Sequence, residues 1–589
     1  KVNATYLDPY SKGSILVMAL GLHGSNGQAA WDVADIPDFL HELITVKYFA
    51  SFDRFDTELV SKGMLSGNNA NILRAMTYFI HQALVHLDPN LYNFENIEEG
   101  LCRHPELTQR LMEAFKWKFH PELHDIQRYE DAKQQFSDMV DKLDTGQEEN
   151  DSRRKNILKQ ALNMVEHTLK TNAYRLNFTA LSFRLDPQYL DMIPFDRQKK
   201  FPELPYAIFF IKGMHYFGYH IRFRDLARGG LRTVFPEQNE RMVAERGTIF
   251  TECYNLAYTQ HLKNKDIPEG GAKGLIFLKP NERLDSEAEI YRQELKKNNI
   301  SEEVMSDKIA QFRKEQTEEY LHQAQRSYVE ALTTIVNCEP SGSLRARRIV
   351  DYWKRPEYLY LGPDENMHDA MILWIAEYSR MHQYKPGTSF ITSKPKAGIN
   401  HKEYGVTSLG VNVYMKEFLK YLAIDPAKET FTIKIAGGPD GDVAGNQICN
   451  LYKYYPETAK LLAIVDISGT AFDPKGLDLS LLHEMFKKGQ PIRYYPHDKL
   501  SAGAYLVDKF SKKETSPVAQ QILLLKKTGA GLVEEWISGS EMNHLLRNTI
   551  NKTKTDLFIP AGGRPRTLNE SNWKEFLDEN GKPTSKIII

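Results

Sequence analysis

Apolar residues recur at intervals of three and four along much of the first 200 residues. In the segment 156–171 they are Ile157, Leu158, Leu162, Val165 and Leu169. This spacing is typical of an amphipathic helix. We therefore predict a mainly helical N-terminal region over residues 1–180, with a polar loop or linker at 144–154.

The pattern changes to strict alternation after Tyr206. Apolar and polar side chains alternate over residues 217–224, which predicts β-strands. A helix is predicted at 239–260, and residues 181–400 form a predicted substrate domain. Its segment 286–336 carries charges of alternating sign and is predicted as a helical insertion. A solvated helical face is favoured there over a partner-binding surface.

A third pattern begins after residue 400, where strands alternate with helices. FTIKIA at 431–436 reads as a strand, the glycine-rich stretch 437–446 as a turn leading into a helix, and LLAIV at 461–465 as the next strand. This order predicts a Rossmann-like dinucleotide-binding domain over residues 401–589. The predicted fold class is thus α/β, with a substrate domain, a following Rossmann-like domain and a helical N-terminal region.

The glycine-rich turn GGPDGDVAGN indicates dinucleotide binding. Gly438 and Gly441 allow a tight turn and close approach of a pyrophosphate to the N-terminus of the next helix. Asp466 ends the second strand, 25 residues after Gly441, where a carboxylate can accept hydrogen bonds from the ribose of NAD and repel the 2′-phosphate of NADP. A glycine-rich turn that binds nothing is the alternative.

Cations lie beside paired glycines in two stretches, ARGGLR and LKNKDIPEGGAKG. Arg228 precedes Gly229 and Gly230, while Lys263 and Lys273 flank a second glycine pair. Such a cluster can bind a dicarboxylate, with glycines leaving room for the ligand. A lysine that shares a desolvated pocket with other cations gives up its proton more readily, which makes Lys273 a candidate general base.

An acidic partner for Lys273 is found in YLGPDENMHD. Asp364 lies there in a predicted turn just before a helix that starts at Asp369. A carboxylate in this position can exchange protons with a nitrogen atom. It can equally cap the helix, and both interpretations stay open.

Composition narrows the function classes. Lys plus Arg number 76 against 77 Asp plus Glu, so no charge excess indicates nucleic acid or an anionic membrane as partner. The four cysteines lack disulfide-framework or zinc-ligand spacing, which indicates a reducing compartment and no metal site. The apolar runs are too short to span a bilayer, and the start at Lys1 suggests a fragment or processed chain.

Together with LGPDEN, YGVTSLG and DLFIPAGGRP, these motifs resemble the catalytic region of the large NAD-specific glutamate dehydrogenases, in the same order along the chain. The resemblance covers residues 175–589. It implies oxidative deamination of L-glutamate to 2-oxoglutarate and ammonia with NAD, in a homo-oligomer such as a tetramer or hexamer. The implied location is intracellular, in the cytoplasm or the mitochondrial matrix.

The resemblance also implies roles for individual residues. Arg228, with Gly229 and Gly230, would bind the substrate side-chain carboxylate and Lys263 the α-carboxylate, while Lys273 and Asp364 would be catalytic. The implied cofactor contacts are Thr407, Ser408, Gly438, Gly441, Asp442, Val443, Asp466, Gly562 and Gly563.

Leu275 departs from the common GGAKGG, and the chain ends at Ile589, before the family's C-terminal segment would finish the cofactor domain. The alternatives are a related dehydrogenase acting on apolar amino acids, which Arg228 disfavours, and a catalytically silent dinucleotide-binding scaffold.

Overall fold

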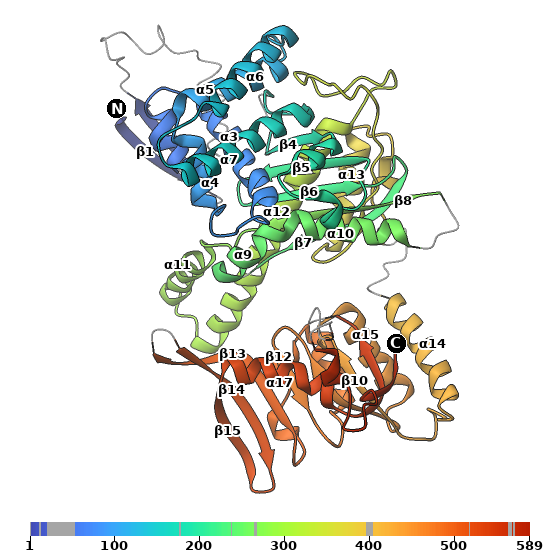
Figure 1. Cartoon of the computed structure of the whole chain (residues 1–589). Helices are drawn as coiled ribbons and strands as arrows, with labels where there is room; N and C mark the ends of the chain where they lie inside the picture. The colour runs from blue at the N-terminus through green and yellow to red at the C-terminus, as the bar shows by residue number, and fades with distance from the viewer. Residues whose placement is uncertain are drawn as a thin grey trace. The chain divides into compact units, whose positions relative to one another are not determined.

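The chain forms two compact units, Lys1–Gly398 and Ile399–Ile589, in the computed structural model (Figure 1). The structure describes residues 2–10, 13–20, 53–175, 178–236, 238–263, 268–395, 404–516, 519–562, 568 and 572–589. Among these residues, no helix has the length and apolar character needed to cross a membrane.

A seven-stranded mixed sheet forms the centre of the first unit, in the order β3-β4-β5-β6-β8-β7-β9. Its strands are β3 (Thr168–Thr171), β4 (Ala180–Leu185), β5 (Ala207–Gly213), β6 (Tyr216–Arg222), β7 (Ala227–Val234), β8 (Gly270–Leu278) and β9 (Gly362–Pro363). Neighbours are antiparallel from β3 to β8, and β7 pairs in parallel with β8 and β9. The strands predicted after Tyr206 are confirmed as β5 and β6.

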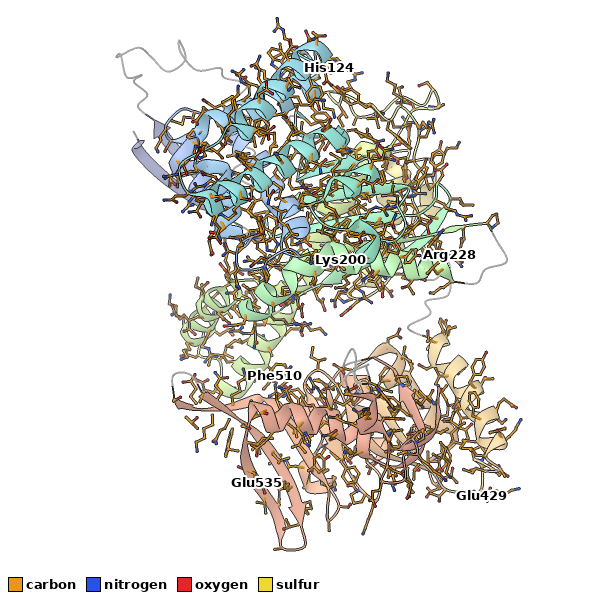
Figure 2. The ribbon with its side chains drawn as sticks, in the orientation of Figure 1. His124, Lys200, Arg228, Glu429, Phe510 and Glu535 are labelled. Atoms are coloured by element: carbon orange, nitrogen blue, oxygen red, sulfur yellow. The ribbon has the colours of Figure 1, made fainter. Side chains whose placement is uncertain are left out.

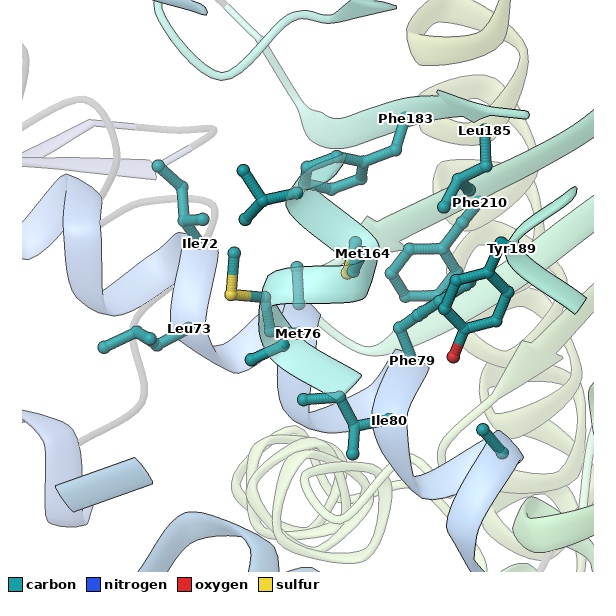
Figure 3. Packing of buried hydrophobic residues seen from close by; sticks show 14 of the residues in the cluster. Ile72, Leu73, Met76, Phe79, Ile80, Met164, Phe183, Leu185, Tyr189 and Phe210 are labelled. Carbon is teal, nitrogen blue, oxygen red and sulfur yellow. The ribbon is translucent and has the colours of Figure 1, made fainter. Parts of the chain in front are cut away.

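Helices precede the sheet in sequence and pack against one of its faces. They are α3 (Gly67–Leu84), α4 (Phe94–Cys102), α5 (Pro105–Phe119), α6 (Ile126–Asp141) and α7 (Glu148–His167). Figure 3 shows Met76 and Phe79 of α3 beside Met164 of α7, Phe183 of β4 and Phe210 of β5. The rings of Phe79 and Phe210 have centroids 5.3 Å apart. Helices and sheet therefore share one hydrophobic core.

A hairpin of β1 (Val2–Tyr10) and β2 (Gly13–Leu20) in the N-terminal region was not predicted. The prediction of a loop over 144–154 was wrong from residue 148 onward. Helix α7 starts at Glu148, inside the segment predicted as a loop, because acidic residues in its first turn favour a helix N-terminus. It ends at His167, and Thr168–Thr171 forms the edge strand β3. The predicted domain boundary near residue 180 stays a prediction.

The other face of the sheet is covered by α12 (Glu302–Val336) and α13 (Asp369–Met381). The segment 286–336 is helical as predicted, with α11 (Leu284–Lys297) followed by α12, while its being an insertion stays a prediction. However, Tyr328, Val329 and Leu332 of α12 are fully buried. The prediction of a solvated face thus holds for the beginning of α12 but not for its C-terminal part, which is core. The predicted helix at 239–260 is divided into α9 (Asn239–Glu245), η3 (Arg246–Thr248) and α10 (Ile249–Leu262).

Shorter helices complete the first unit. They are η1 (Asp56–Val60), η2 (Pro187–Met192), α8 (Arg197–Lys200) and η4 (Gly387–Phe390).

The second unit contains an eight-stranded sheet in the order β15-β14-β13-β12-β11-β10-β16-β17. Its strands are β10 (Phe431–Ala436), β11 (Ala459–Val465), β12 (Gly469–Phe472), β13 (Tyr505–Ser516), β14 (Ala519–Thr528), β15 (Gly531–Ser538), β16 (Thr555–Pro560) and β17 (Ser585–Ile588). Strands β11, β10, β16 and β17 are parallel, as predicted for a dinucleotide-binding fold. Strands β12 to β15 are antiparallel to one another. Helix α16 lies between β12 and β13 in sequence, but β13, β14 and β15 follow one another without a helix between them.

The helices of the second unit are α14 (Val406–Tyr421), α15 (Asp442–Tyr454), α16 (Leu479–Lys488), α17 (Gly539–Lys552) and the short η5 (Ile492–Tyr494), η6 (His497–Lys499) and η7 (Trp573–Phe576). Residues from α15, α16 and the parallel strands form one apolar cluster, and α17 packs in a second cluster. The predicted α/β fold class is confirmed. Side chains of both units are drawn in Figure 2.

Candidate active site

Three adjacent strands of the first sheet carry two residues predicted to be catalytic. Gly230 of β7 lies in register with Lys273 of β8 on one side and with Gly362 of β9 on the other. Neighbouring residues of a ladder share one face of the sheet, so Lys273 projects beside Gly230. Asp364, two residues after Gly362, reaches the same place from the opposite side. The two residues are 91 positions apart in sequence, and the sheet register brings them together.

The ammonium group of Lys273 donates a hydrogen bond to Oδ2 of Asp364. Burial by itself raises the pKa of Asp364, but the charge and hydrogen bond of Lys273, together with the charge of Arg232, outweigh it. The net pKa of Asp364 is therefore below its ordinary value, and the group is held as a carboxylate. The side chains of Lys273 and Asp364 are 11% and 30% exposed, so the pair is partly accessible.

Glycine at position 230 makes room for this pair. A Cβ atom at Gly230 would lie 3.2 Å from Nζ of Lys273 and 3.3 Å from Oδ2 of Asp364. Gly229 lies on the opposite face of β7, and glycine is needed there for a different reason. A Cβ atom at this position would overlap the carbonyl oxygen of Ala272 on the neighbouring strand. Of the two glycines, the structure thus places Gly230 at the Lys273–Asp364 pair and gives Gly229 a packing role.

Arg228 lies on the same face of β7 as Gly230, because residues two apart in a strand point the same way. Its Nε atom is 2.9 Å from Oε1 of Glu269, and its side chain is 51% exposed (Figure 2 labels it). Lys263 follows the end of α10, is exposed, and donates to Oε1 of Gln260 over 2.7 Å. The structure therefore places Arg228 on the same face of the sheet as Lys273, and gives Lys263 a hydrogen-bond partner in Gln260 of α10.

Further charged residues lie around the pair and were not predicted from the sequence. Nε of Arg232 lies 3.7 Å from Oδ2 of Asp364, and its Nη1 lies 3.3 Å from Oε1 of Glu252 on α10. Glu269 holds Arg228. Arg232 could have been found from the strand period, since it follows Gly230 by two residues in ARGGLR. Glu252 had no such signal, because only packing of α10 against β7 brings it there.

In the second unit, the turn between β10 and α15 is built from glycines. Gly437 has φ +136°, and its Cβ would lie 2.7 Å from Cβ of Ala444 and 2.9 Å from the carbonyl oxygen of Ala561. Gly441 is the N-cap of α15, and no side chain caps this helix end. The first N–H groups of α15 are therefore available to an anion. Gly437 was not among the predicted residues, although the doublet with Gly438 was a visible signal.

The N-termini of α14 and α15 lie together. Oγ of Ser408 donates to the carbonyl oxygen of Val443 over 2.8 Å, and Ser408 is only 1% exposed. Thr407 beside it is exposed, and Asp442 is the first residue of α15. The predicted cofactor residues from these two motifs thus gather at one place, with the Ser408 hydroxyl already engaged by the backbone.

Strand β16 brings a third motif to this end of the sheet. The N–H of Ala561 donates to the carbonyl oxygen of Ala436 over 2.7 Å, next to the β10–α15 turn. Gly562 follows with φ +104°, a backbone conformation that favours glycine. Gly563 lies outside the described residues. Gly562 is therefore close in the fold to the end of β10, as expected for a shared ligand site.

Asp466 directly follows β11 and is 2% exposed. Its Oδ1 accepts from the N–H and hydroxyl groups of Ser468 and from the N–H of Gly469, and its Oδ2 accepts from the N–H of Ile492. The carboxylate is thus engaged by its own loop through Oδ1 and by η5 through Oδ2, and its predicted ribose contact stays a prediction.

A second carboxylate lies beside Asp466. Asp440 and Asp466 both approach the position that a Cβ of Gly438 would occupy. Partial desolvation and the charge of Asp466 raise the pKa of Asp440 to about 6. A group that titrates near neutrality therefore lies in the glycine-rich turn.

The described residues contain no group of three or more His, Cys, Asp or Glu placed to hold a metal ion. A mixed sheet bearing a lysine–aspartate pair, and a second sheet whose parallel strands lead into a glycine-rich turn, are typical of the class of two-part, dinucleotide-dependent dehydrogenases. The model of the bacterial NAD-glutamate dehydrogenase catalytic domain matches residues 139–529, and that of glutamate dehydrogenase helical motif 3 matches residues 50–121. The chain belongs to the NAD-glutamate dehydrogenase family.

Individual relatives agree with this membership. Glutamate dehydrogenase 2 of Dictyostelium discoideum is 29% identical over 94% of this chain and 46% of its own length. The NAD-specific glutamate dehydrogenases of Neurospora crassa and Saccharomyces cerevisiae are each 32% identical, over 72% and 75% of this chain and 34% and 35% of their own lengths. The chain thus spans about half or less of the length of these relatives.

Proposed function

We propose that this chain catalyses the reversible, NAD-dependent oxidative deamination of L-glutamate to 2-oxoglutarate and ammonia. The observation that supports this most directly is the hydrogen-bonded pair of Lys273 and Asp364, with Arg228 on the same face of the sheet. A base, an acid and a carboxylate-binding cation are the groups that the reaction needs in one place.

Arg228 is proposed to bind the side-chain carboxylate of glutamate, and Lys263 the α-carboxylate. A guanidinium can bind a carboxylate through two parallel hydrogen bonds. Oε1 of Glu269 is paired with Nε of Arg228. A substrate carboxylate would therefore bind the remaining guanidinium nitrogens or displace Glu269. For Lys263, the long flexible side chain has to leave Gln260 when substrate binds.

The β10–α15 turn is proposed to bind NAD. The uncapped N-terminus of α15 and the glycines at 437, 438 and 441 suit a pyrophosphate that approaches the backbone closely. Thr407, Ser408, Gly562 and Gly563 are proposed to contribute to the same site. When bound, NAD supplies the acceptor for the hydride that leaves Cα of glutamate.

Lys273 and Asp364 are proposed to move the protons of the reaction. Lys273, once deprotonated, removes a proton from the water molecule that attacks Cα of the iminium form of the substrate. Asp364, held as a carboxylate, accepts a proton and returns it to the nitrogen that departs as ammonia. Arg232 helps to keep Asp364 ionised and in place. The enzyme is further proposed to be an intracellular homo-oligomer, in the cytoplasm or the mitochondrial matrix.

The test is an absorbance assay of NADH formation by the purified 589-residue chain with a panel of amino acids. Turnover with glutamate, and little with leucine, valine or phenylalanine, is expected. Preference for an apolar amino acid would instead identify a related dehydrogenase. Binding of NAD with no turnover of any amino acid would indicate a silent scaffold.

Replacing Arg228 by Leu should raise KM for glutamate about 10- to 100-fold, since losing a charge-assisted hydrogen bond costs roughly 1.5–3 kcal/mol. Steady-state kinetics with glutamate would measure this. The KM of Arg228→Lys for glutamate should lie between those of the parent and Arg228→Leu. Lysine keeps the positive charge but lacks the two parallel N–H donors of a guanidinium. Arg241→Leu on the exposed face of α9 is the control. An unchanged KM in Arg228→Leu would remove this residue from the substrate site.

The pair of Asp440 and Asp466 predicts a pH effect on NAD binding. Above pH 6 the ionised Asp440 repels a pyrophosphate, and below pH 6 it is neutral. We expect the Kd for NAD to fall about threefold between pH 7.5 and 5.5, as one screened charge near an anion predicts. Asp440→Asn should bind tightly at both pH values in a fluorescence titration.

The pH dependence of the protein's thermal stability should also reflect the titration of Asp440. The folded-state pKa of Asp440 is above its ordinary value, so this carboxyl favours the folded state at low pH, an effect lost as pH rises through 6. Asp440→Asn should therefore melt at a higher temperature than the parent at pH 8. Glu457→Gln, on the surface, is the control. Equal pH slopes in the parent and Asp440→Asn would contradict the assignment.

A further inference from the structure

A cavity of about 940 Å³ lies in the first unit, apart from the Lys273–Asp364 pair. Its walls come from the loop between β3 and β4, the C-terminal part of α12, the loop 345–348 and the end of α13. Strands β3 and β4 form one edge of the sheet, and β5 and β6 separate them from the strand that carries Lys273. The cavity is therefore a different site from the proposed active site.

Positive charge dominates the lining of this cavity. Its arginines are Arg175, Arg345, Arg347 and Arg348. They come from two segments that are 170 or more residues apart in sequence, so folding is what gathers them. Glu330 is the one acidic residue in the lining, and its Oε2 accepts a hydrogen bond from Oγ1 of Thr179 over 2.9 Å. His382, which follows the end of α13, also lines the cavity.

Two of the four guanidinium groups are paired outside the cavity. Nη1 of Arg345 lies 2.8 Å from Glu339, and Nη1 of Arg348 lies 2.8 Å from Glu122. Within the part of the chain that the structure describes, neither Arg175 nor Arg347 has a carboxylate partner.

Arg175 is the more informative of the unpaired arginines because it is half-buried. Burial lowers the pKa of Arg175, and the phenol of Tyr378 opposes this only in part. A half-buried cation without a counter-ion is costly in the folded state unless a ligand or solvent compensates it. Arg347, by contrast, is exposed, where an unpaired charge costs little.

We propose that this cavity binds a small molecule with at least two anionic groups, either phosphates or carboxylates. Arginine forks recognise both groups through parallel hydrogen bonds. The volume falls within the range of roughly 300–1,000 Å³ found for small-molecule sites. One anionic group pairs with Arg175 in the interior, and a second reaches the exposed Arg347 at the rim.

The test is isothermal titration of the 589-residue chain with inorganic pyrophosphate and with citrate, at constant ionic strength, with acetate as the monovalent control. Saturable binding of pyrophosphate or citrate is expected, with no measurable binding of acetate. Binding of pyrophosphate alone would identify the phosphate class, and binding of citrate alone the carboxylate class. No turnover is measured, so the result does not depend on the proposed function.

Arginine variants test whether the probe binds in this cavity. Arg175→Ala with Arg347→Ala should weaken it at least tenfold, and Arg347→Ala alone, on an exposed residue that the fold does not need, should weaken it severalfold. Arg292→Ala on α11 should bind like the parent. Saturating NAD should leave the binding unchanged, because the residues that line the cavity belong to the first unit and the β10–α15 turn belongs to the second. The proposal is overturned if neither probe binds, if the arginine variants bind as tightly as Arg292→Ala, or if NAD displaces the probe.

Discussion

Lys273→Ala should fold and lose almost all turnover of glutamate. Removing the ammonium group takes away the proposed base, and general acid–base catalysis contributes roughly 10²- to 10⁴-fold. It also leaves Asp364 in a partly buried place without the cation that keeps its pKa low, so the carboxylate becomes easier to protonate. The measurement is kcat for NADH formation, with circular dichroism to check folding.

A matched control for this variant is Lys297→Ala, at the C-terminal end of α11. It should retain the kcat of the parent. NAD should bind Lys273→Ala with ordinary affinity, because the proposed cofactor residues lie in the second unit. NADH production at the parent rate by Lys273→Ala would refute the catalytic assignment, whatever else the chain does.

Gly229→Ala should destabilise the first unit by about 3 kcal/mol, the upper end of the usual cost of overpacking. The new methyl group would overlap the carbonyl oxygen of Ala272, and that oxygen belongs to the backbone of β8 and cannot rotate away. Strands β7 and β8 would have to separate. Urea unfolding followed by circular dichroism should show the loss as a lower midpoint for the first unit.

Gly230→Ala is the matched comparison, one residue further along the same strand. Its methyl group would meet the ends of Lys273 and Asp364, which are side chains and can shift by a few tenths of an ångström. This variant should therefore stay folded and lose mainly kcat. If Gly229→Ala unfolds at the same urea concentration as Gly230→Ala, the packing role of Gly229 is wrong.

Local sequence pattern was sufficient for much of the fold. The alternation after Tyr206 predicted strands, and the order of strand, glycine turn and helix at 431–454 predicted the first part of the dinucleotide-binding fold. These predictions succeeded because each depends on residues close in sequence. The helix at 148–154 was missed because its residues are polar, and its start depends on acidic groups near the helix end.

The C-terminal part of α12 shows the limit of charge patterning. Charges of alternating sign predicted a solvated helix over 286–336, but Tyr328 and Leu332 are fully buried against the sheet. The first half of the helix extends beyond the sheet and the second half covers it. Only the positions of distant strands determine where that change falls along one continuous helix.

The sequence alone determined the chemical types present: paired glycines, three candidate cations, an acid before a helix and a glycine-rich turn after a strand. The tertiary structure decided which of these residues lie close together. The parallel register of β7, β8 and β9 places Lys273 and Asp364 on either side of Gly230. Lys263 instead donates to Gln260, and Asp466 accepts from Ser468, Gly469 and Ile492. The tertiary structure also gathers four arginines around one cavity. These arrangements depend on contacts between residues that are far apart in the chain. A local hydrophobic period in the sequence does not specify the distance between two strands or two helices.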